Sequence, residues 1–265
     1  MVMGPTHAMS GAAAGLAVAT LLPATWGGPS SLAETFVWAG VCAGAALLPD
    51  LDHPQSTVAR SFGVVSQLGS EGINTASAAF YGLTRTAKDG HRSDGHRTLT
   101  HTLLFAILLG AAVSALVTAF GKPAIIGTLF LTLGLAIRGL AGDWSKKQGW
   151  LAVTLSAALL SVLVWQAIPA ETGSASLGLA VAFGCIVHCL GDGITKEGIP
   201  FLAPLVVVRG KRWWEFTLPS LIRIRADGPF EKVVLLPALT VITVALAVWA
   251  VPEFSATVEA ALAGP

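Results

Sequence analysis

The amino-acid sequence predicts an all-α protein that crosses a membrane several times. Of its 265 residues, 54% are hydrophobic and only 12% are charged, and the mean hydropathy is +0.71. A soluble domain normally carries about 25% charged residues. So few charges cannot cover a water-facing surface of this size, which argues against a soluble enzyme. The 29 glycines are typical of closely packed membrane helices.

Seven apolar segments are predicted as membrane helices, and we interpret residues 1–265 as one integral membrane domain. The segments are 8–25, 35–48, 99–120, 124–141, 150–168, 175–190 and 233–251. A helix needs roughly 20 apolar residues to cross a bilayer, with about 17 as the lower end. The third, fifth and seventh segments meet this comfortably. The first two are shorter and are compatible with tilted, half-buried or re-entrant helices.

Two long polar connections join these segments. Residues 49–98 are rich in Ser, Gly and Thr and contain a mildly amphipathic stretch near 58–83. Residues 191–232 combine several Arg and Lys residues with Trp213 and Trp214. Trp beside basic residues is typical of a segment at the lipid–water interface. A plain solvated loop is the alternative interpretation.

The distribution of basic residues predicts the orientation. When the connections alternate between two sides, all of the 16 Lys and Arg residues except Lys122 fall on the side of the N-terminus. By the positive-inside rule this side is the cytoplasm and the C-terminus lies outside. All six histidines fall on this side or at its helix ends, together with three aspartates. Imidazole and carboxylate are the usual ligands of zinc and related divalent metals, so the sequence predicts a metal site at the cytoplasmic face.

The first candidate group follows the second apolar segment, where Asp50, Asp52 and His53 stand between two prolines. The prolines are expected to end the helix and to hold the chain extended, so that both carboxylates point the same way. Paired carboxylates repel each other unless a cation or a proton lies between them. We therefore favour metal binding over the alternative, a polar cap at the end of a membrane helix.

The second group, His96-Arg97-Thr98-Leu99-Thr100-His101, enters the third apolar segment. Thr98 or Thr100 can cap this helix, which places His101 within its first turn. An ionisable group inside a membrane helix is costly and is a functional candidate. The planar fork of Arg97 can bind a phosphate or carboxylate oxyanion. Contact with a lipid phosphate is the alternative role for Arg97.

The third group contains His188 and Asp192. They are four positions apart and share one helical face, where two ligands can hold the same metal. A structural His–Asp hydrogen bond is the alternative. His7 is a weak candidate alone but lies on the same predicted side of the membrane. His91 stands in a loop rich in Gly, Asp and Ser, and we interpret it as an ordinary loop residue.

These blocks resemble the YdjM family of multi-pass inner-membrane proteins. The matching stretches are LPDLDHPQS, HRTLTHT and HCLGDGITKEGIPFLAP, preceded by the early His7, and they extend to about Leu218. The family is described as LexA-regulated, membrane-bound, metal-dependent hydrolases. It is grouped with the superfamily of zinc-dependent phospholipase C and single-strand nucleases, in which helices supply His and Asp ligands to clustered zinc ions that cleave phosphoesters.

The resemblance implies metal or catalytic roles for eight residues. These are His7, Asp50, Asp52, His53, His96, His101, His188 and Asp192. It also marks Arg97 and Thr100 in the second block, and with Thr195 these are the candidate substrate-binding residues. Two departures occur, because Thr98 stands where the family usually has Gly and Lys196 where Pro follows the Thr. Neither removes a ligand, although Thr98 is expected to narrow the approach to the site.

The sequence thus predicts a metal-dependent hydrolase with its site at the cytoplasmic mouth of a helical bundle. Zn²⁺ is the favoured ion, with Mn²⁺ or Mg²⁺ as alternatives. Asp50 or Asp52 would orient the attacking water or act as its base, and Arg97 would stabilise developing negative charge. A phosphoester in or near the lipid is the expected substrate, membrane lipids are the expected partners, and no specific nucleic-acid binding is expected. A metal or ion transporter and a non-catalytic scaffold with a structural metal are the alternatives.

Overall fold

The computed structural model describes residues 2–167 and 174–252, and the regular secondary structure of these residues is helical, with isolated β-bridges but no strand. The α-helices are α1 (Gly4–Ala19), α2 (Leu32–Ala45), α3 (Val64–Thr84), α4 (Leu103–Phe120), α5 (Lys122–Leu140), α6 (Gly142–Ala167), α7 (Ser174–Gly193) and α8 (Leu236–Trp249). Short 3-10 helices span Ala24–Trp26, Pro49–Asp52 and Leu99–His101, and a π-helical turn, Glu231–Leu235, precedes α8. The prediction of an all-α fold is confirmed.

Each of the seven predicted segments coincides with a helix, although Ile168, the last residue of the fifth, lies outside the described residues. Six helices are long and apolar enough to cross a membrane. The seventh, α1, has 16 residues and packs against α2, α7 and α8. These findings confirm a multi-pass membrane protein.

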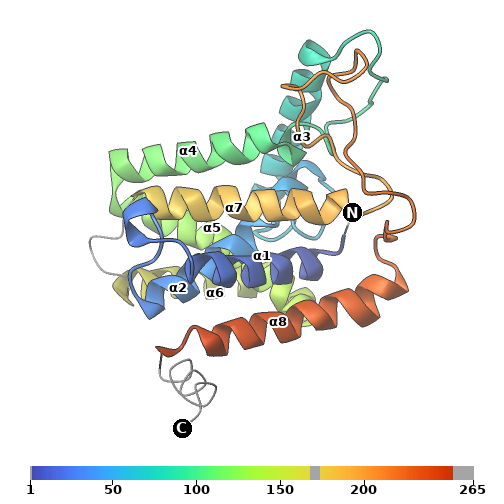
Figure 1. Cartoon of the computed structure of the whole chain (residues 1–265). Helices are drawn as coiled ribbons and strands as arrows, with labels where there is room; N and C mark the ends of the chain where they lie inside the picture. Colours follow the sequence, from blue (N-terminus) through green and yellow to red (C-terminus); the bar gives the residue numbers. More distant parts are fainter. Residues whose placement is uncertain (1, 168–173, 253–265) are drawn as a thin grey trace.

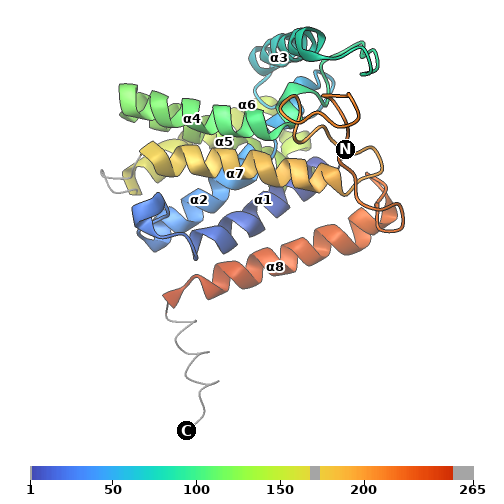
Figure 2. The same ribbon diagram turned by 45° about the horizontal axis from the view of Figure 1, so that its top comes forward.

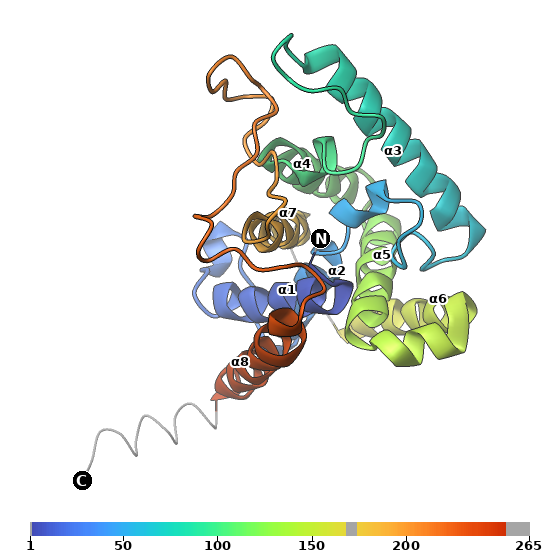
Figure 3. The same ribbon diagram turned by 90° about the vertical axis from the view of Figure 1, so that its right-hand side faces the viewer.

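The bundle has a buried centre and a lipid-facing periphery. In the apolar stretches of α2 and α7, 72% and 61% of the residues are buried, whereas the figure is 17% for α4 and α6 and zero for α8. Viewed along the bundle, α4, α5, α6 and α8 surround α1, α2 and α7 (Figure 3). The outward side chains of the peripheral helices are apolar, for example Leu155 on α6 and Val241 on α8, as expected for a surface solvated by lipid.

Small residues allow the central helices to approach closely. A Cβ atom on Gly44 of α2 would overlap the carbonyl oxygen of Thr132 on α5. A Cβ on Gly184 of α7 would lie 2.5 Å from the carbonyl oxygen of Cys42 on α2. Such backbone-to-backbone contact is the packing mode that the glycine content predicted.

The predicted polar connection 49–98 contains a long helix, α3, which lies across one end of the bundle (Figures 1 and 3). Its inward side is polar. Ser70 Oγ donates a hydrogen bond to the carbonyl oxygen of Leu51 (2.5 Å), and Asn74 Nδ2 donates to that of Asp52 (2.6 Å). These bonds fix the turn that follows α2 to a helix outside the bundle.

Segment 194–230 extends over the same end of the bundle and contacts the C-terminal half of α3 (Figures 1 and 2). Trp213 is buried, with its ring centroid 5.0 Å from that of Tyr81. Asp89, in the loop after α3, accepts hydrogen bonds from the backbone N–H groups of Trp213 (3.1 Å) and Arg212 (3.3 Å). Trp213 therefore packs within the protein, whereas the position of segment 191–232 at the lipid–water interface stays a prediction.

Candidate metal centre

Buried histidines and aspartates from four separate parts of the chain meet at the end of the bundle that carries the N-terminus (Figure 3). They come from α1, the turn after α2, the turn before α4 and the last turns of α7. The residues are His7, Asp50, Asp52, His101, His188 and Asp192, none of them more than 3% exposed. Six of the eight predicted metal or catalytic residues thus form one buried cluster.

Asp50 and Asp52 lie in the 3-10 turn Pro49–Asp52, so the predicted extended chain is wrong. Pro49 occupies the first position of the turn, where its fixed φ angle suits a helical path, and the chain continues to coil beyond α2. Residues two apart in such a turn point in different directions. The two carboxylates therefore contact different partners.

Asp50 and Asp192 alternate with two histidines around a common point. Asp50 Oδ1 lies 3.8 Å from His101 Nε2 and 3.7 Å from His188 Nε2. Asp192 Oδ2 lies 3.8 Å and 3.9 Å from the same two nitrogens. Ligands bound about 2.1 Å from a tetrahedral zinc ion lie about 3.4 Å from one another, so these four atoms are spaced, slightly expanded, for a single ion.

Several of these ligand atoms have no hydrogen-bond partner. Within the described residues, Nε2 of His101, Nε2 of His188 and Oδ1 of Asp50 are all buried and unpaired. An unsatisfied buried polar group costs about 1–3 kcal/mol, and here three converge on one point. A divalent cation between them would satisfy all three, so the residues fit a metal.

His7 adds a second, overlapping group. One ligand atom from each of His7, Asp50 and His188 lies within 4.8 Å of the others, and the same is true of His101, His188 and Asp192. The His7 and His188 rings stack with centroids 3.9 Å apart. The cluster therefore offers two sets of three ligands that share His188.

The other ring nitrogens of two histidines are held by oxygen atoms. His188 Nδ1 lies 2.8 Å from the carbonyl oxygen of Ala46 and must donate to it, since a carbonyl only accepts. Thr100 Oγ1 donates its hydrogen to Asp52 Oδ2 (2.6 Å), so His101 Nδ1 must donate to Thr100 Oγ1 (3.0 Å). Both Nε2 atoms are thereby left with a free lone pair, as metal-ligating histidines require.

The surroundings of His101 favour positive charge. Burial by itself lowers the pKa of this imidazole, but Asp52 and the other nearby carboxylates outweigh it and raise the pKa overall. The site would therefore attract a cation.

Asp52 occupies a supporting position. Its Oδ1 is 2.8 Å from His96 Nδ1, and its Oδ2 accepts from the Arg97 N–H (3.0 Å) and the Thr100 hydroxyl. Both Asp52 oxygens thus have hydrogen-bond partners on the Nδ1 side of His101, opposite its unpaired Nε2. The structure thus brings this predicted ligand to the cluster and places it 3.3 Å from Nδ1 of His101.

The model of the YdjM inner membrane protein family matches residues 1–154 and 151–254. The chain belongs to the YdjM inner membrane protein family. No curated protein and no solved structure matches it. The match confirms the family resemblance drawn from the three sequence blocks, and with the apolar helices it identifies an integral membrane protein of the inner-membrane type.

Arg97 of this YdjM family protein joins two carboxylates through an unusual backbone conformation. Its φ angle is +54°, a left-handed value that is uncommon for residues other than glycine. In this conformation the N–H reaches Asp52, while Nη2 donates to Asp192 Oδ2 (2.7 Å) and Nη1 to the Gly198 carbonyl (3.2 Å). The guanidinium thus lies against the metal-facing oxygen of Asp192.

Three other candidates lie around the cluster. His96 is partly exposed and stacks on His53, with ring centroids 4.8 Å apart; burial and His96 lower the pKa of His53. His53 belongs to neither group with metal-ligand spacing among the described residues. Thr195 is buried, and its hydroxyl donates to the Asp192 carbonyl (2.7 Å) at the end of α7. His91 is exposed, as predicted.

A cavity of about 310 Å³ lies beside the cluster, on the side of Arg97. Its lining residues are His96, Arg97, Glu197, Gly198, Pro200 and Glu215. Neither glutamate was among the predicted site residues, although Glu197 stands in the third matching block, two residues after Thr195. Glu215 pairs with Arg92 (2.9 Å). Burial alone would raise the pKa of Glu197, but hydrogen bonds to its own backbone N–H and to Thr195 lower it overall.

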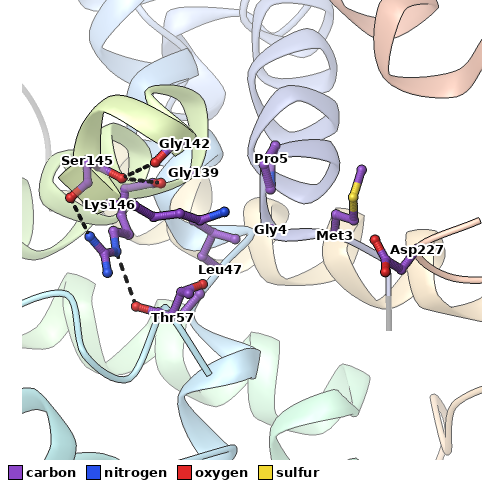
Figure 4. A pocket seen from close by; sticks show the side chains of 12 residues that line it. Met3, Gly4, Pro5, Leu47, Thr57, Gly139, Gly142, Ser145, Lys146 and Asp227 are labelled. Carbon is purple, nitrogen blue, oxygen red and sulfur yellow. Dashed lines mark hydrogen bonds between the residues drawn. The ribbon is translucent and has the colours of Figure 1, made fainter. Parts of the chain in front are cut away.

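A second cavity, of about 280 Å³, opens between α1, α5 and α6 (Figure 4). Lys146 and Asp227 lie on opposite sides of it. The Arg138 guanidinium in its wall donates to the carbonyl oxygens of Thr57 (3.3 Å) and Ser145 (2.8 Å). Its lining includes no histidine, so it is separate from the metal centre.

Proposed function

We propose that this protein is a membrane-bound, metal-dependent hydrolase that cleaves a phosphoester in or near the lipid, at a site facing the cytoplasm. The observation that carries the proposal is the convergence of unpaired ligand atoms from His101, His188 and Asp50. They lie behind Arg97, which also lines the cavity of about 310 Å³. A metal next to a cationic anion-binding group that lines a surface cavity is an arrangement suited to phosphoester hydrolysis.

His101, His188, Asp50 and Asp192 would hold the ion, and His7 would complete a second set. Mixed imidazole and carboxylate ligands favour Zn²⁺, with Mn²⁺ or Mg²⁺ as alternatives. When bound, such an ion polarises a phosphoryl oxygen and lowers the pKa of water to near neutrality.

The residues of the chain would divide the remaining work. Arg97 would stabilise negative charge that develops on the phosphoryl oxygens. His96 lines the cavity and has its Nδ1 held by Asp52, so its Nε2 is free to accept a proton from water and return it to the leaving alkoxide. Asp52 and Thr100 position His101. The roles assigned to Asp52 and His96 differ from those predicted by the sequence.

The alternative function of ion transport has less support. A conduit needs polar groups along the length of the bundle, whereas this cluster lies at one end. Within α5, the hydroxyls of Thr128 and Thr132 donate to backbone carbonyls one turn earlier, so they offer no path for an ion.

A single substitution should remove both the bound metal and the hydrolytic activity. His101→Ala removes a buried ligand and should abolish both bound zinc and hydrolysis of an aryl phosphodiester by the detergent-purified protein. His91→Ala changes an exposed loop histidine and serves as the matched control, which should retain both. Full metal content in His101→Ala would contradict the ligand assignment. A wild-type protein that binds zinc but hydrolyses neither the aryl phosphodiester nor a phospholipid would contradict the hydrolase.

A further inference from the structure

A narrow apolar groove of about 190 Å³ lies on the side of the bundle, between α4 and α5 and beneath α3. Phe105, Leu109 and Val113 of α4 form one wall, and Thr128 and Leu131 of α5 form part of the other. Leu109 and Val113 follow Phe105 at intervals of four residues on one face of α4. At 1.5 Å per residue, the wall from Phe105 to Val113 is about 12 Å long.

The groove exists because α4 and α5 separate toward the site. They are joined by a tight turn at Gly121, yet α4 packs mainly on α7, and α5 on α2 and α6. At the other end, Ile73 of α3 forms the roof. The space between α4 and α5 is therefore bounded by other helices and remains open to the side.

The inner end of the groove reaches the metal centre. Leu48 and Leu51, which line it, immediately flank the sequence Pro49-Asp50. Phe105 lies four residues after His101. The turn Pro49–Asp52 thus presents Leu51 to the groove and Asp50 to the cluster, and Phe105 stands in the first turn of α4, just after the turn that holds His101.

The chemistry of the groove suits a hydrocarbon chain. The hydroxyl of Thr128 is satisfied by its own helix, so the walls offer apolar surface. The groove continues into the exposed apolar face of α4, where Leu108 and Leu116 face the lipid. Its volume is below the roughly 300–1,000 Å³ of pockets that enclose bulky ligands, which fits one slender chain.

We propose that this groove binds an acyl chain of the substrate, which makes the substrate a lipid-linked phosphoester that enters sideways from the bilayer. Its polar head would pass Leu51 to reach Arg97 and the metal centre, while the chain stays between α4 and α5. The hydrolytic part of this inference rests on the proposed function. The binding of the chain does not.

Photo-crosslinking tests the binding directly. The full-length protein in nanodiscs is labelled with phosphatidylglycerol that carries a diazirine within an acyl chain, and the labelled peptides are mapped. We expect labelling concentrated on 105–113 and 128–132. Labelling spread evenly over the lipid-facing helices, α6 and α8 included, would overturn the proposal whatever any variant does.

A matched pair of variants sharpens the test. Val113→Trp fills the groove, and its groove labelling should fall about ten-fold because overpacking excludes the chain. Leu155→Trp adds the same side chain to the lipid-exposed face of α6 and should leave the labelling within about two-fold of wild type, since exposed substitutions change little. Unchanged labelling in folded Val113→Trp, checked by gel filtration, would refute the inference.

Activity then separates this inference from the hydrolase. Val113→Trp should slow hydrolysis of long-chain phosphatidylglycerol but leave that of a water-soluble aryl phosphodiester unchanged. Equal loss on both substrates would refute a role of the groove in substrate binding. If the wild-type protein hydrolyses neither substrate yet is labelled in the groove, the proposed function fails and the chain-binding site remains.

Discussion

The hydroxyl of Thr100 connects His101 to Asp52, and replacing it tests whether this contact orients a metal ligand. Thr100→Val keeps the shape of the side chain and removes both hydrogen bonds, of 3.0 Å to His101 Nδ1 and 2.6 Å to Asp52 Oδ2. Loss of a group that orients a ligand typically weakens metal binding 10- to 100-fold, or about 1.4–2.7 kcal/mol. Asp52 Oδ2 already lies 3.3 Å from His101 Nδ1 and would accept its hydrogen directly. We therefore expect Thr100→Val to weaken zinc binding by about ten-fold, the lower end of this range.

The assay is competition for Zn²⁺ between the purified protein and a chromogenic chelator. Thr102→Val is the matched control, because Thr102 caps α4 by accepting from the Phe105 N–H (3.1 Å) and touches no ligand in the described structure. It should lower stability by about 1 kcal/mol and leave the zinc Kd within about two-fold. An unchanged Kd for Thr100→Val, or equal weakening by Thr102→Val, would refute the orienting role.

Three further predictions concern packing, the segment over the site and orientation. Gly44→Ala should lower stability to thermal unfolding in detergent by about 3 kcal/mol, since its Cβ would overlap the Thr132 carbonyl oxygen. Gly127 has open space around it, so Gly127→Ala should cost no stability. Equal losses of stability in the two variants would contradict this close packing of α2 on α5. Hydrogen bonds from Thr86 and from backbone N–H groups, among them that of Trp213, outweigh burial and lower the pKa of Asp89. Its stabilising contribution is therefore present above the unfolded-state value of about 3.9 and is lost as the pH falls through the lower folded value. The measurement is backbone hydrogen exchange of segment 194–230, corrected for the intrinsic effect of pH. In Asp89→Asn the exchange should already be faster at neutral pH, whereas in the wild-type protein it should become faster only at acidic pH. Unchanged exchange in the variant would contradict a stabilising role of the Asp89 carboxylate. Alkaline phosphatase fused to the C-terminus should be active and a fluorescent-protein fusion dark if the N-terminus is cytoplasmic, and the reverse pattern would show the orientation to be wrong.

The sequence predicted features that depend on local spacing. The four-residue separation of His188 and Asp192 placed both on one face of a helix, and their ligand atoms lie 3.9 Å apart. The helices formed where the apolar segments stood, because hydrophobicity over some 20 residues decides insertion regardless of distant contacts. The convergence of the histidines on one end of the bundle was predicted because successive connections between membrane helices alternate between its two ends.

Thr102 caps α4, so the prediction of Thr98 or Thr100 as its cap is wrong. Tertiary contacts decide it, since Thr100 is bound to Asp52 and the Leu103 N–H to the carbonyl oxygen of Phe201. His101 consequently lies before the helix, in a 3-10 turn, and the prediction that it lies within the first helical turn is wrong. The left-handed backbone of Arg97 is equally invisible in the sequence, because two aspartates distant along the chain fix it.

Helix α3 was difficult to predict because its amphipathic character is reversed over part of its length. Val64, Val65 and Leu68 are exposed, whereas Ser70 and Asn74 point inward. Farther along, Tyr81 is buried in the usual manner. Analysis of periodicity assumes that an apolar face is the buried one, and at a membrane surface this assumption fails. The polar face is needed where it is, since it bonds to the turn that carries Asp50.

This reversed helix links the two sites that we propose. Asn74 holds the backbone of Asp52, whose carboxylate reaches His101 through Thr100. One residue earlier in the same helix, Ile73 roofs the apolar groove. A displacement of α3 would therefore disturb the orientation of a metal ligand and the entrance for an acyl chain together. An apolar outer face resting on lipid would make both respond to the bilayer surface, which is where a lipid-linked substrate would arrive.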